Sequence, residues 1–209
     1  MHRPRFCTQG KYGFCLFSFA LPAVTLTMFN LHMAVQHLLN GGVIAHPTEG
    51  VWGLACLPDN DEAVQQLIAL KGRDPAKGLI LIGDDCRRFE PWTAALSQND
   101  HALLDQHWPG PTTFVVPDPT GIASDWVRGQ HQSVALRVTD HALSASLCAA
   151  VGSCLVSSSA NPAGRPAPFY EWQVRRYFGG QVDFYLSGAT GGRRQPSRII
   201  DLISGRSLR

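Results

Sequence analysis

The sequence predicts a single α/β domain, in which helices flank a twisted, mixed and largely parallel sheet. The 209-residue length suits one domain, and 44% hydrophobic with 16% charged residues excludes an intrinsically disordered chain. Short apolar runs alternate with segments of helical periodicity, and no repeat or linker interrupts this alternation. Ligands of such sheets bind beyond the carboxyl ends of the strands, so polar residues at those ends are the first candidates for a site.

The first convincing helix covers residues 31–40, with apolar residues at helical spacing and Gly41 as its stop. Asp59 or Asn60 can cap a second helix, which runs through Leu70. Further helices are predicted over residues 94–107, 141–151 and 169–178. Strands are predicted over residues 42–45, 51–57, 79–82, 112–116, 133–138, 154–157, 182–186 and 198–202.

Charge and motif content exclude several classes of protein. The formal net charge of +2 excludes histone-like neutralisation of nucleic acid, although a local basic groove is compatible with it. The six cysteines include no CxxC pair and the eight histidines no HExxH motif, so we expect free thiols and no resident metal site. GxxxxGK[ST], GxGxxG and GxSxG motifs are also missing from the sequence, so any nucleotide is bound by other devices.

The N-terminal segment is basic over residues 1–11 and almost wholly apolar or small over residues 12–26. An export signal, a membrane anchor and an extension upstream of a later start are the three interpretations. Pro22 interrupts the apolar run, which is short for a membrane span. We favour the extension: residues 1–27 lie outside the fold, residues 28–209 form the domain, and the protein is cytoplasmic with no membrane association.

A cluster of three cations, Lys71, Arg73 and Lys77, lies at the end of the second helix. Gly72 ends that helix, so Lys71 and Arg73 can converge. A single cation here would be explained by the helix dipole. Three cations within seven residues fit a site for a polyphosphate or a carboxylate as well as they fit that explanation.

Hydroxyl-bearing residues follow two predicted strands. Ser157, Ser159 and Asn161 come directly after an apolar strand and can donate to an anion without adding charge, although a serine-rich turn is the alternative. Thr48 follows the first strand and can contact a substrate. The alternative there is an ordinary turn with a solvated Glu49.

Arg137 lies inside the apolar run Val134–Val138. Charged residues are almost never fully buried without a partner, so Arg137 requires an internal acid or faces a cavity. It either clamps a substrate carboxylate, or pairs with Asp140, or points outward from an edge strand.

Six segments in order resemble one family: HPTEGVWGLAC, LKGRDPAKGLILI, HWPGPTTFV, SVALRVTDH, LVSSSANPAG and PSRIIDL. Together they resemble the TsaC (YrdC) family of threonylcarbamoyl-AMP synthases in its short, single-domain form. The resemblance runs from about residue 31 to the C-terminus. It implies a YrdC-like fold and the conversion of L-threonine, bicarbonate and ATP into L-threonylcarbamoyladenylate, diphosphate and water. The product would supply downstream threonylcarbamoyl-transfer proteins that modify adenosine in tRNAs reading codons that begin with A, and tRNA itself is a possible partner.

The resemblance also implies roles for individual residues. Its catalytic tetrad falls on Lys71, Arg73, Ser159 and Asn161. Its ATP-binding positions fall on Arg73, Lys77, Ser133, Ser159 and Arg209, with Mg2+ expected alongside ATP. Its threonine-binding positions fall on Thr48, Arg137, Ser157 and Ser197. Two features depart from the family: Ile82-Gly83 stands where longer members often have a histidine, and the residues that usually follow the nucleotide-binding arginine are missing after Arg209.

Two other functions compete with this one. An Arg-lined α/β surface could track double-stranded RNA without catalysis, and would then show many arginines on one face and no closed cavity. A carbamoyl-transfer domain of hydrogenase-maturation proteins is the second, although the Cys-rich segments and acylphosphatase portion of those chains have no counterpart in this sequence.

Overall fold

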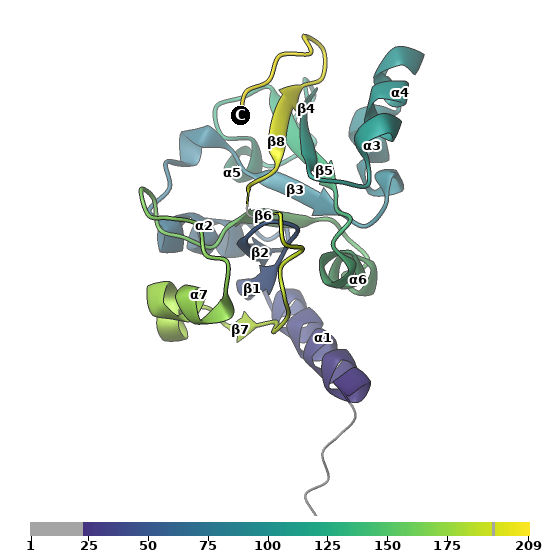
Figure 1. Cartoon of the computed structure of the whole chain (residues 1–209). Coiled ribbons are helices and arrows are strands. Elements are labelled where there is room, and N and C mark those ends of the chain that lie inside the picture. The colour runs from purple at the N-terminus through teal and green to yellow at the C-terminus, as the bar shows by residue number, and fades with distance from the viewer. Residues whose placement is uncertain (1–22, 194) are drawn as a thin grey trace, which may run out of the picture.

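The computed structural model describes residues 23–193 and 195–209, with the side chains of residues 23–26 left out. Within this part of the chain, eight strands form one sheet in the order β7-β1-β2-β6-β3-β5-β4-β8 (Figure 1). The expected single α/β domain with a mixed sheet and flanking helices is confirmed.

The elements lie close to their predicted positions. The strands are β1 (Ile44–Pro47), β2 (Trp52–Cys56), β3 (Ile80–Gly83), β4 (Thr112–Pro117), β5 (Ser133–Val138), β6 (Leu155–Ser159), β7 (Phe184–Tyr185) and β8 (Arg198–Asp201). The α-helices are α1 (Ala23–Leu39), α2 (Asp61–Lys71), α3 (Glu90–Thr93), α4 (Gln98–His107), α5 (Asp125–Arg128), α6 (Ala142–Val151) and α7 (Glu171–Phe178). Three 3-10 turns complete the described elements: η1 (Pro75–Lys77), η2 (Cys86–Phe89) and η3 (Gly179–Gln181).

Helix α1 begins at Ala23, earlier than the predicted start at residue 31. The domain boundary expected at residue 28 therefore falls inside a helix. Among the described side chains of α1, Ala34 is the first that is buried, while Met28 and Phe29 are exposed. The part of α1 that packs on the domain thus lies within residues 31–40, where the sequence shows apolar residues at helical spacing.

The sheet contains fewer parallel neighbours than the sequence predicted. Among the described strands, three neighbouring pairs are parallel (β1–β7, β3–β5 and β4–β8). Four are antiparallel (β1–β2, β2–β6, β3–β6 and β4–β5). The difference arises because a tight turn joins β1 to β2 and because β6 inserts between β2 and β3, antiparallel to both. The direction in which a strand runs cannot be read from its apolar residues alone.

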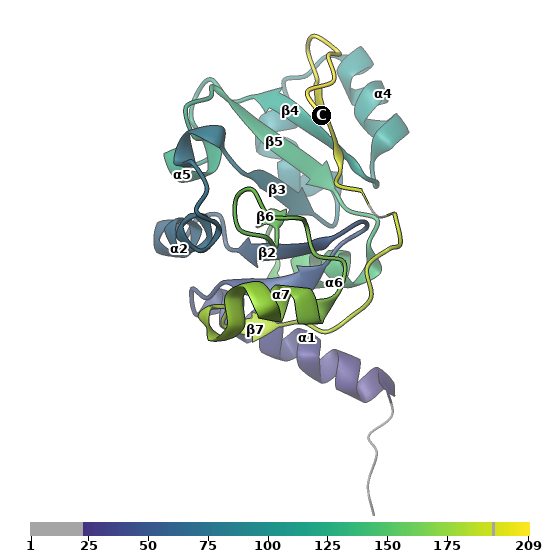
Figure 2. The ribbon, with the colours of Figure 1, turned by 60° about the vertical axis from the view of Figure 1, so that its left-hand side comes forward.

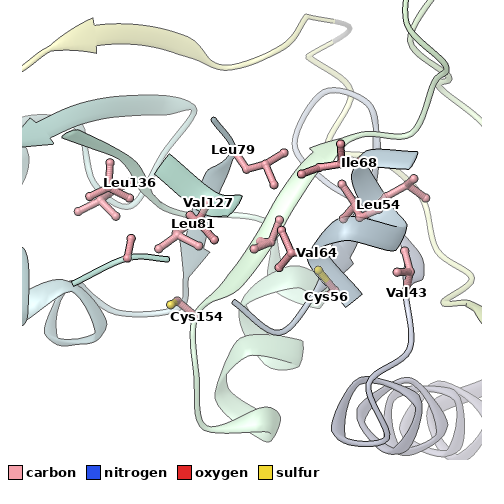
Figure 3. Packing of buried hydrophobic residues seen from close by; sticks show 14 of the residues in the cluster. Val43, Leu54, Cys56, Val64, Ile68, Leu79, Leu81, Val127, Leu136 and Cys154 are labelled. Carbon is pink, nitrogen blue, oxygen red and sulfur yellow. The ribbon is translucent and has the colours of Figure 1, made fainter. Parts of the chain in front are cut away.

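One face of the sheet carries the larger hydrophobic core, into which α2, α5 and α7 pack. Leu54 of β2, Leu81 of β3 and Leu136 of β5 point into this layer (Figure 3). Asn60 caps α2 as predicted, because its Oδ1 accepts from the Ala63 N–H at 3.0 Å. The described cysteines are free thiols, of which Cys56, Cys148 and Cys154 are buried and Cys86 is exposed. Cys7 and Cys15 lie outside the described residues.

The opposite face is only partly covered by helices. There, α1 and α6 pack over a smaller cluster that includes Ile44, Ala55, Ile82 and Leu155. Ser157 shares this face, because directly opposite residues on neighbouring strands point to the same side and Ser157 pairs with Ala55. The part of the face beyond α1 and α6 is left for a site.

The segment between β7 and β8 joins opposite edges of the sheet. Figures 1 and 2 show it running from β7 at one end of the molecule to β8 at the other. It passes against the β1–β2 turn, where the Gly191 and Arg193 N–H groups donate to the carbonyls of Thr48 and Glu49. A Cβ on Gly50 would lie 1.9 Å from the Gln195 carbonyl oxygen, so only glycine allows this close approach.

Candidate active site

A cavity of about 310 Å3 opens on the face that α1 and α6 leave uncovered. Its volume falls in the range of small-molecule sites. Apart from Ser158, the residues of β2, β3, β5 and β6 that line it share the register position of Ser157 or differ from it by an even number of residues. Nine of the eleven predicted site residues line the cavity: Thr48, Arg73, Lys77, Ser133, Arg137, Ser157, Ser159, Ser197 and Arg209. Lys71 and Asn161 are not among its lining residues.

Arg137 both faces the cavity and has an internal acid. Its Nη2 lies 3.5 Å from Glu49 Oε2, and both side chains are less than one-tenth exposed. Glu49 Oε1 in turn accepts from Thr139 Oγ1 at 2.6 Å and from the Asp140 N–H at 3.3 Å. Although burial alone would raise the pKa of Glu49, the charge of Arg137 and the Thr139 hydrogen bond outweigh it and lower that pKa. Glu49 is therefore ionised at neutral pH.

Two interpretations from the sequence are wrong here. Glu49 is not a solvated turn residue but a buried one. Asp140 is not the partner of Arg137, because its carboxylate faces Arg193 at 3.3 Å near the surface. The sequence required an internal acid or a cavity for Arg137, and the structure provides both, but the β1–β2 turn that supplies the acid is distant in the chain.

Lys71 and Asn161 hold the loop that follows β6. Lys71 Nζ donates to the carbonyl oxygens of Ser159 and Asn161, the latter at 2.8 Å. Asn161 Nδ2 donates to the carbonyls of Pro162 and Arg165. Burial and, after it, the charge of Arg73 lower the pKa of Lys71 to about 8. These two residues therefore position Ser159 from behind rather than facing the cavity.

Arg73 reaches the cavity through the turn at Gly72. Gly72 ends α2 in the left-handed conformation with φ of 56°, as its predicted role as a helix stop requires. The Arg73 guanidinium lies against η1, where Nε and Nη2 donate to the Gly78 carbonyl at 3.2 and 2.8 Å. Lys71 and Arg73 thus leave the helix end in different directions, one toward the loop after β6 and the other to the cavity rim.

Positive charge dominates the cavity wall. The cations among its described lining residues are Arg73, Lys77, Arg128, Arg137 and Arg209. The carboxylate among them is Glu49, which Arg137 already engages. Burial lowers the pKa of Arg209, and the charges of Arg137 and Arg73 lower it further, so these guanidinium groups repel one another across the cavity. An anionic ligand would relieve this repulsion.

The hydroxyl groups of the cavity fall into two sets. Thr48 Oγ1 donates to the Val51 carbonyl at 2.7 Å, and Ser197 Oγ accepts from Thr113 Oγ1 at 3.0 Å and from Arg209 Nη2 at 3.3 Å. In contrast, the hydroxyls of Ser133, Ser157 and Ser159 make no hydrogen bond to the described residues. The second set is available to a ligand.

The sequence did not identify Arg128, His131 and Glu49 as cavity residues. Arg128 closes the single-turn helix α5, which is too short to display a period. Ile82 and Gly83, where longer family members have a histidine, do not line the cavity, and Ile82 is buried in the smaller cluster. No group of three or more His, Cys, Asp or Glu side chains that could hold a metal occurs among the described residues. The described helices include none long and apolar enough to cross a membrane.

Comparison with known proteins assigns the chain to a family. The model of the Sua5/YciO/YrdC family, described as "Telomere recombination", matches residues 36–209. A threonylcarbamoyl-AMP synthase of Chromohalobacter salexigens is 53% identical over 176 residues, which are 84% of this chain and 94% of that relative. A threonylcarbamoyl-AMP synthase of Marinobacter nauticus is 46% identical over 183 residues, which are 88% of this chain and 96% of that relative.

Solved structures agree with this assignment. P. abyssi Sua5 complexed with L-threonine matches with a TM-score of 0.76 and 26% identity, covering 82% of this chain and 50% of that chain. This chain thus spans about half the length of that protein. E. coli YciO, with a TM-score of 0.76 but 19% identity, shares the fold over 88% of this chain and 89% of its own. By both its sequence and its fold, the chain belongs to the Sua5/YciO/YrdC family, among relatives named threonylcarbamoyl-AMP synthase.

Proposed function

We propose that this chain is a threonylcarbamoyl-AMP synthase, a nucleotidyltransferase that converts L-threonine, bicarbonate and ATP into L-threonylcarbamoyladenylate, diphosphate and water. The observation that supports this most is that one cavity brings together five cations and three serine hydroxyls that make no hydrogen bond to the described residues. The anionic carbamate must approach the polyanionic triphosphate of ATP, and this approach needs a high density of positive charge and fixed hydrogen-bond donors. Identity of 46–53% to relatives of that name points to the same chemistry.

Threonine binds at the Arg137 end of the cavity in this proposal. The Arg137 guanidinium holds the substrate carboxylate with two parallel hydrogen bonds, while Glu49 holds the guanidinium from behind. Thr48, Ser157 and Ser197 surround the rest of the amino acid. The match to a Sua5 structure solved with L-threonine supports this assignment.

ATP binds toward Arg73, Lys77, Ser133, Ser159 and Arg209. Arg73 and Lys77 offset the charge of the triphosphate, and Ser133 and Ser159 donate to its oxygens. Mg2+ arrives on the phosphates of ATP in this proposal, since the described lining residues offer Glu49 alone as a carboxylate and Arg137 engages it. When bound, the ion offsets negative charge on the phosphates.

The reaction takes two bond-forming steps. The neutral amine of threonine attacks the carbon of bicarbonate, and loss of water leaves a carbamate. A carbamate oxygen then attacks the α-phosphorus of ATP, and the bond to the β-phosphate oxygen breaks, releasing diphosphate. Arg73 stabilises the charge that develops on the phosphoryl oxygens, and Lys71 and Asn161 hold Ser159 in place for that step. Lys71, Arg73, Ser159 and Asn161 therefore form the catalytic set.

The test is a diphosphate-release assay on the purified chain. Release should require ATP, threonine and bicarbonate together, and omission of any one should abolish it. Diphosphate released from ATP without threonine would overturn the proposal. As a matched control, Arg87→Ala removes a fully exposed arginine of η2 and should leave the rate unchanged.

The RNA-binding alternative is not favoured, because its distinguishing sign was an Arg-lined face without a closed cavity. The hydrogenase-maturation protein HypF shares the fold at 17% identity, which supports the fold alone. In our proposal the enzyme acts in the cytoplasm and passes its product to threonylcarbamoyl-transfer proteins that modify tRNA. Residues 1–27 are an extension that the reaction does not need.

A further inference from the structure

His46 lies in β1 beside the cavity but has no role in the reaction as proposed above. It is fully buried and lies directly opposite Gly53 of β2, which in turn lies opposite Ser159 of β6. Because opposite residues point to the same face, His46 shares the face of the cavity-lining serines. It does not itself line the cavity. A buried imidazole at this place needs a partner for each ring nitrogen.

The hydrogen bonds around His46 determine its tautomer. His46 Nδ1 lies 3.2 Å from Ser144 Oγ. The single hydroxyl proton of Ser144 goes to the Pro47 carbonyl at 2.8 Å or to His141 Nδ1 at 3.3 Å. Both are acceptors, because His141 donates from Nε2 to the Ala189 carbonyl. Ser144 therefore accepts from His46, which carries its proton on Nδ1.

His46 Nε2 is consequently a lone-pair acceptor, and it is buried without a hydrogen-bond partner. Leaving a buried acceptor unsatisfied costs about 1–3 kcal/mol. Burial, the largest cause, lowers the pKa of His46 to about 4, so the lone pair is not protonated at neutral pH. What His46 Nε2 lacks is therefore a hydrogen-bond donor beside it, not a proton of its own.

Gly53 separates this acceptor from a hydroxyl of the cavity. A Cβ on Gly53 would lie 3.4 Å from His46 Nε2 and 3.3 Å from Ser157 Oγ. The space beside Gly53 is tight for a side chain, and both the acceptor and the hydroxyl border it. Ser157 lines the cavity, and its hydroxyl makes no hydrogen bond to the described residues.

We propose that His46 is a positioning residue for threonine binding: its Nε2 accepts the Ser157 hydroxyl proton, so that the Ser157 lone pairs face the cavity. Ser157 Oγ then accepts a hydrogen bond from the amine or the hydroxyl of threonine, whose carboxylate Arg137 holds. This inference rests on the proposed function, since it needs threonine in the cavity. With this proposed bond, donation would run in one direction from Ser157 to His46 and on to Ser144, whose contact with His46 the structure shows.

Two amide variants of His46 test the roles of its two ring nitrogens separately. In His46→Asn the side-chain NH2 replaces Nδ1–H as a donor to Ser144 but leaves no acceptor toward Ser157. In His46→Gln the amide oxygen reaches the position of Nε2 and restores that acceptor. We expect His46→Asn to raise the threonine KM about tenfold, the equivalent of one hydrogen bond, with the ATP KM unchanged. His46→Gln should recover most of the threonine affinity. Equal KM values for threonine in the two folded variants would overturn the inference, because a merely structural residue would not distinguish the nitrogens.

Ser157→Ala provides the second measurement. If His46 acts through Ser157, adding His46→Asn to Ser157→Ala should cause no further rise in the threonine KM. A full additional tenfold rise would contradict the inference. Should His46→Asn fail to fold, His46→Gln decides by itself: a retained threonine KM supports the inference, and a raised one overturns it. Failure of the wild-type protein to bind threonine would instead refute the proposed function, so the two failures are distinguishable.

Discussion

Glu49 and Arg137 form a buried ion pair across the β1–β2 turn and β5, with 3.5 Å between Oε2 and Nη2. The pair lies at the cavity wall, where Arg137 is available to a ligand and Glu49 is held by Thr139. A guanidinium fixed in this way presents a planar fork to an incoming carboxylate.

Arg137→Lys should therefore weaken threonine binding far more than ATP binding. Lysine keeps the charge opposite Glu49 but cannot form two parallel hydrogen bonds. We expect a rise in the threonine KM of about 10- to 100-fold, corresponding to a charge-assisted hydrogen bond, with little change in the ATP KM. Threonine amide, which lacks the carboxylate, should be a poor substrate of the wild type and suffer much less from the change. Equal losses for threonine and its amide would mean that Arg137 serves only its pair with Glu49.

Glu49→Gln should destabilise the protein, because it leaves the Arg137 charge buried without its partner. The expected loss is about 3 kcal/mol in the free energy of unfolding, measured in urea. Threonine supplies a new carboxylate, so saturating threonine should raise the melting temperature of Glu49→Gln more than that of the wild type. Asp140→Asn is the matched control: it breaks the exposed pair with Arg193 and should cost less than about 1 kcal/mol. Equal costs for the two variants would be incompatible with a buried Glu49–Arg137 pair.

Arg73→Ala should abolish adenylate formation while the fold persists. Arg73 is half-exposed at the end of α2, and its hydrogen bonds go to the adjacent turn η1. We expect a loss in kcat of about 100-fold or more, as for removal of one donor to a transition state. The unfolding transition should stay within a few degrees of the wild type. Near-normal turnover would remove Arg73 from the catalytic set.

Removal of residues 1–27 should leave a soluble, active enzyme. The deletion shortens α1, but its first buried residue among those described is Ala34. Among the residues that the structure describes, the cavity lining begins at Thr48. Kinetic constants within twofold of the full chain are expected, and an insoluble or inactive product would show that the segment belongs to the domain.

Stability should fall between pH 6.5 and pH 4 because of His46. Its pKa is lowered from 6.5 to about 4, first by burial and then by the charges of His141 and Arg137, with Glu49 opposing them. A folded-state pKa below the unfolded value means that the unfolded chain binds the proton first, so acid favours unfolding. From pH 7 to pH 5 this group should cost about 2 kcal/mol. Urea titrations at both pH values should show a correspondingly smaller drop for His46→Gln, and an equal drop would contradict the assignment.

Local signals predicted most elements and most of the cavity. Asn60 and Gly72 mark the two ends of α2 through their own capping chemistry, and both act as the sequence predicts. The Lys-Gly-Arg and serine-rich segments were likewise visible, because each carries its polar groups within a few residues. Their assembly was not visible from spacing: Lys71 supports Ser159 from behind, whereas Arg73 enters the cavity.

Contacts between distant segments could not be predicted from single residues. The sequence showed that Arg137 needs an internal acid or a cavity, but the acid it suggested, Asp140, is bound to Arg193 instead of to Arg137. Although β6 and β3 lie between β2 and β5 in the sheet, Glu49 reaches Arg137 because the β1–β2 turn extends over the carboxyl end of β5. Gln195 against Gly50 is a second such contact, since it depends on a segment that joins opposite edges of the sheet.

The most direct test of the whole account is mass spectrometry of the product formed with 13C-bicarbonate, L-threonine and ATP. The account predicts a threonylcarbamoyl adenylate whose mass rises by one unit relative to unlabelled bicarbonate, with one diphosphate released per adenylate. Arg137→Lys should form the same product only at raised threonine concentrations. An adenylate without the 13C label, or diphosphate release with no adenylate, would contradict it.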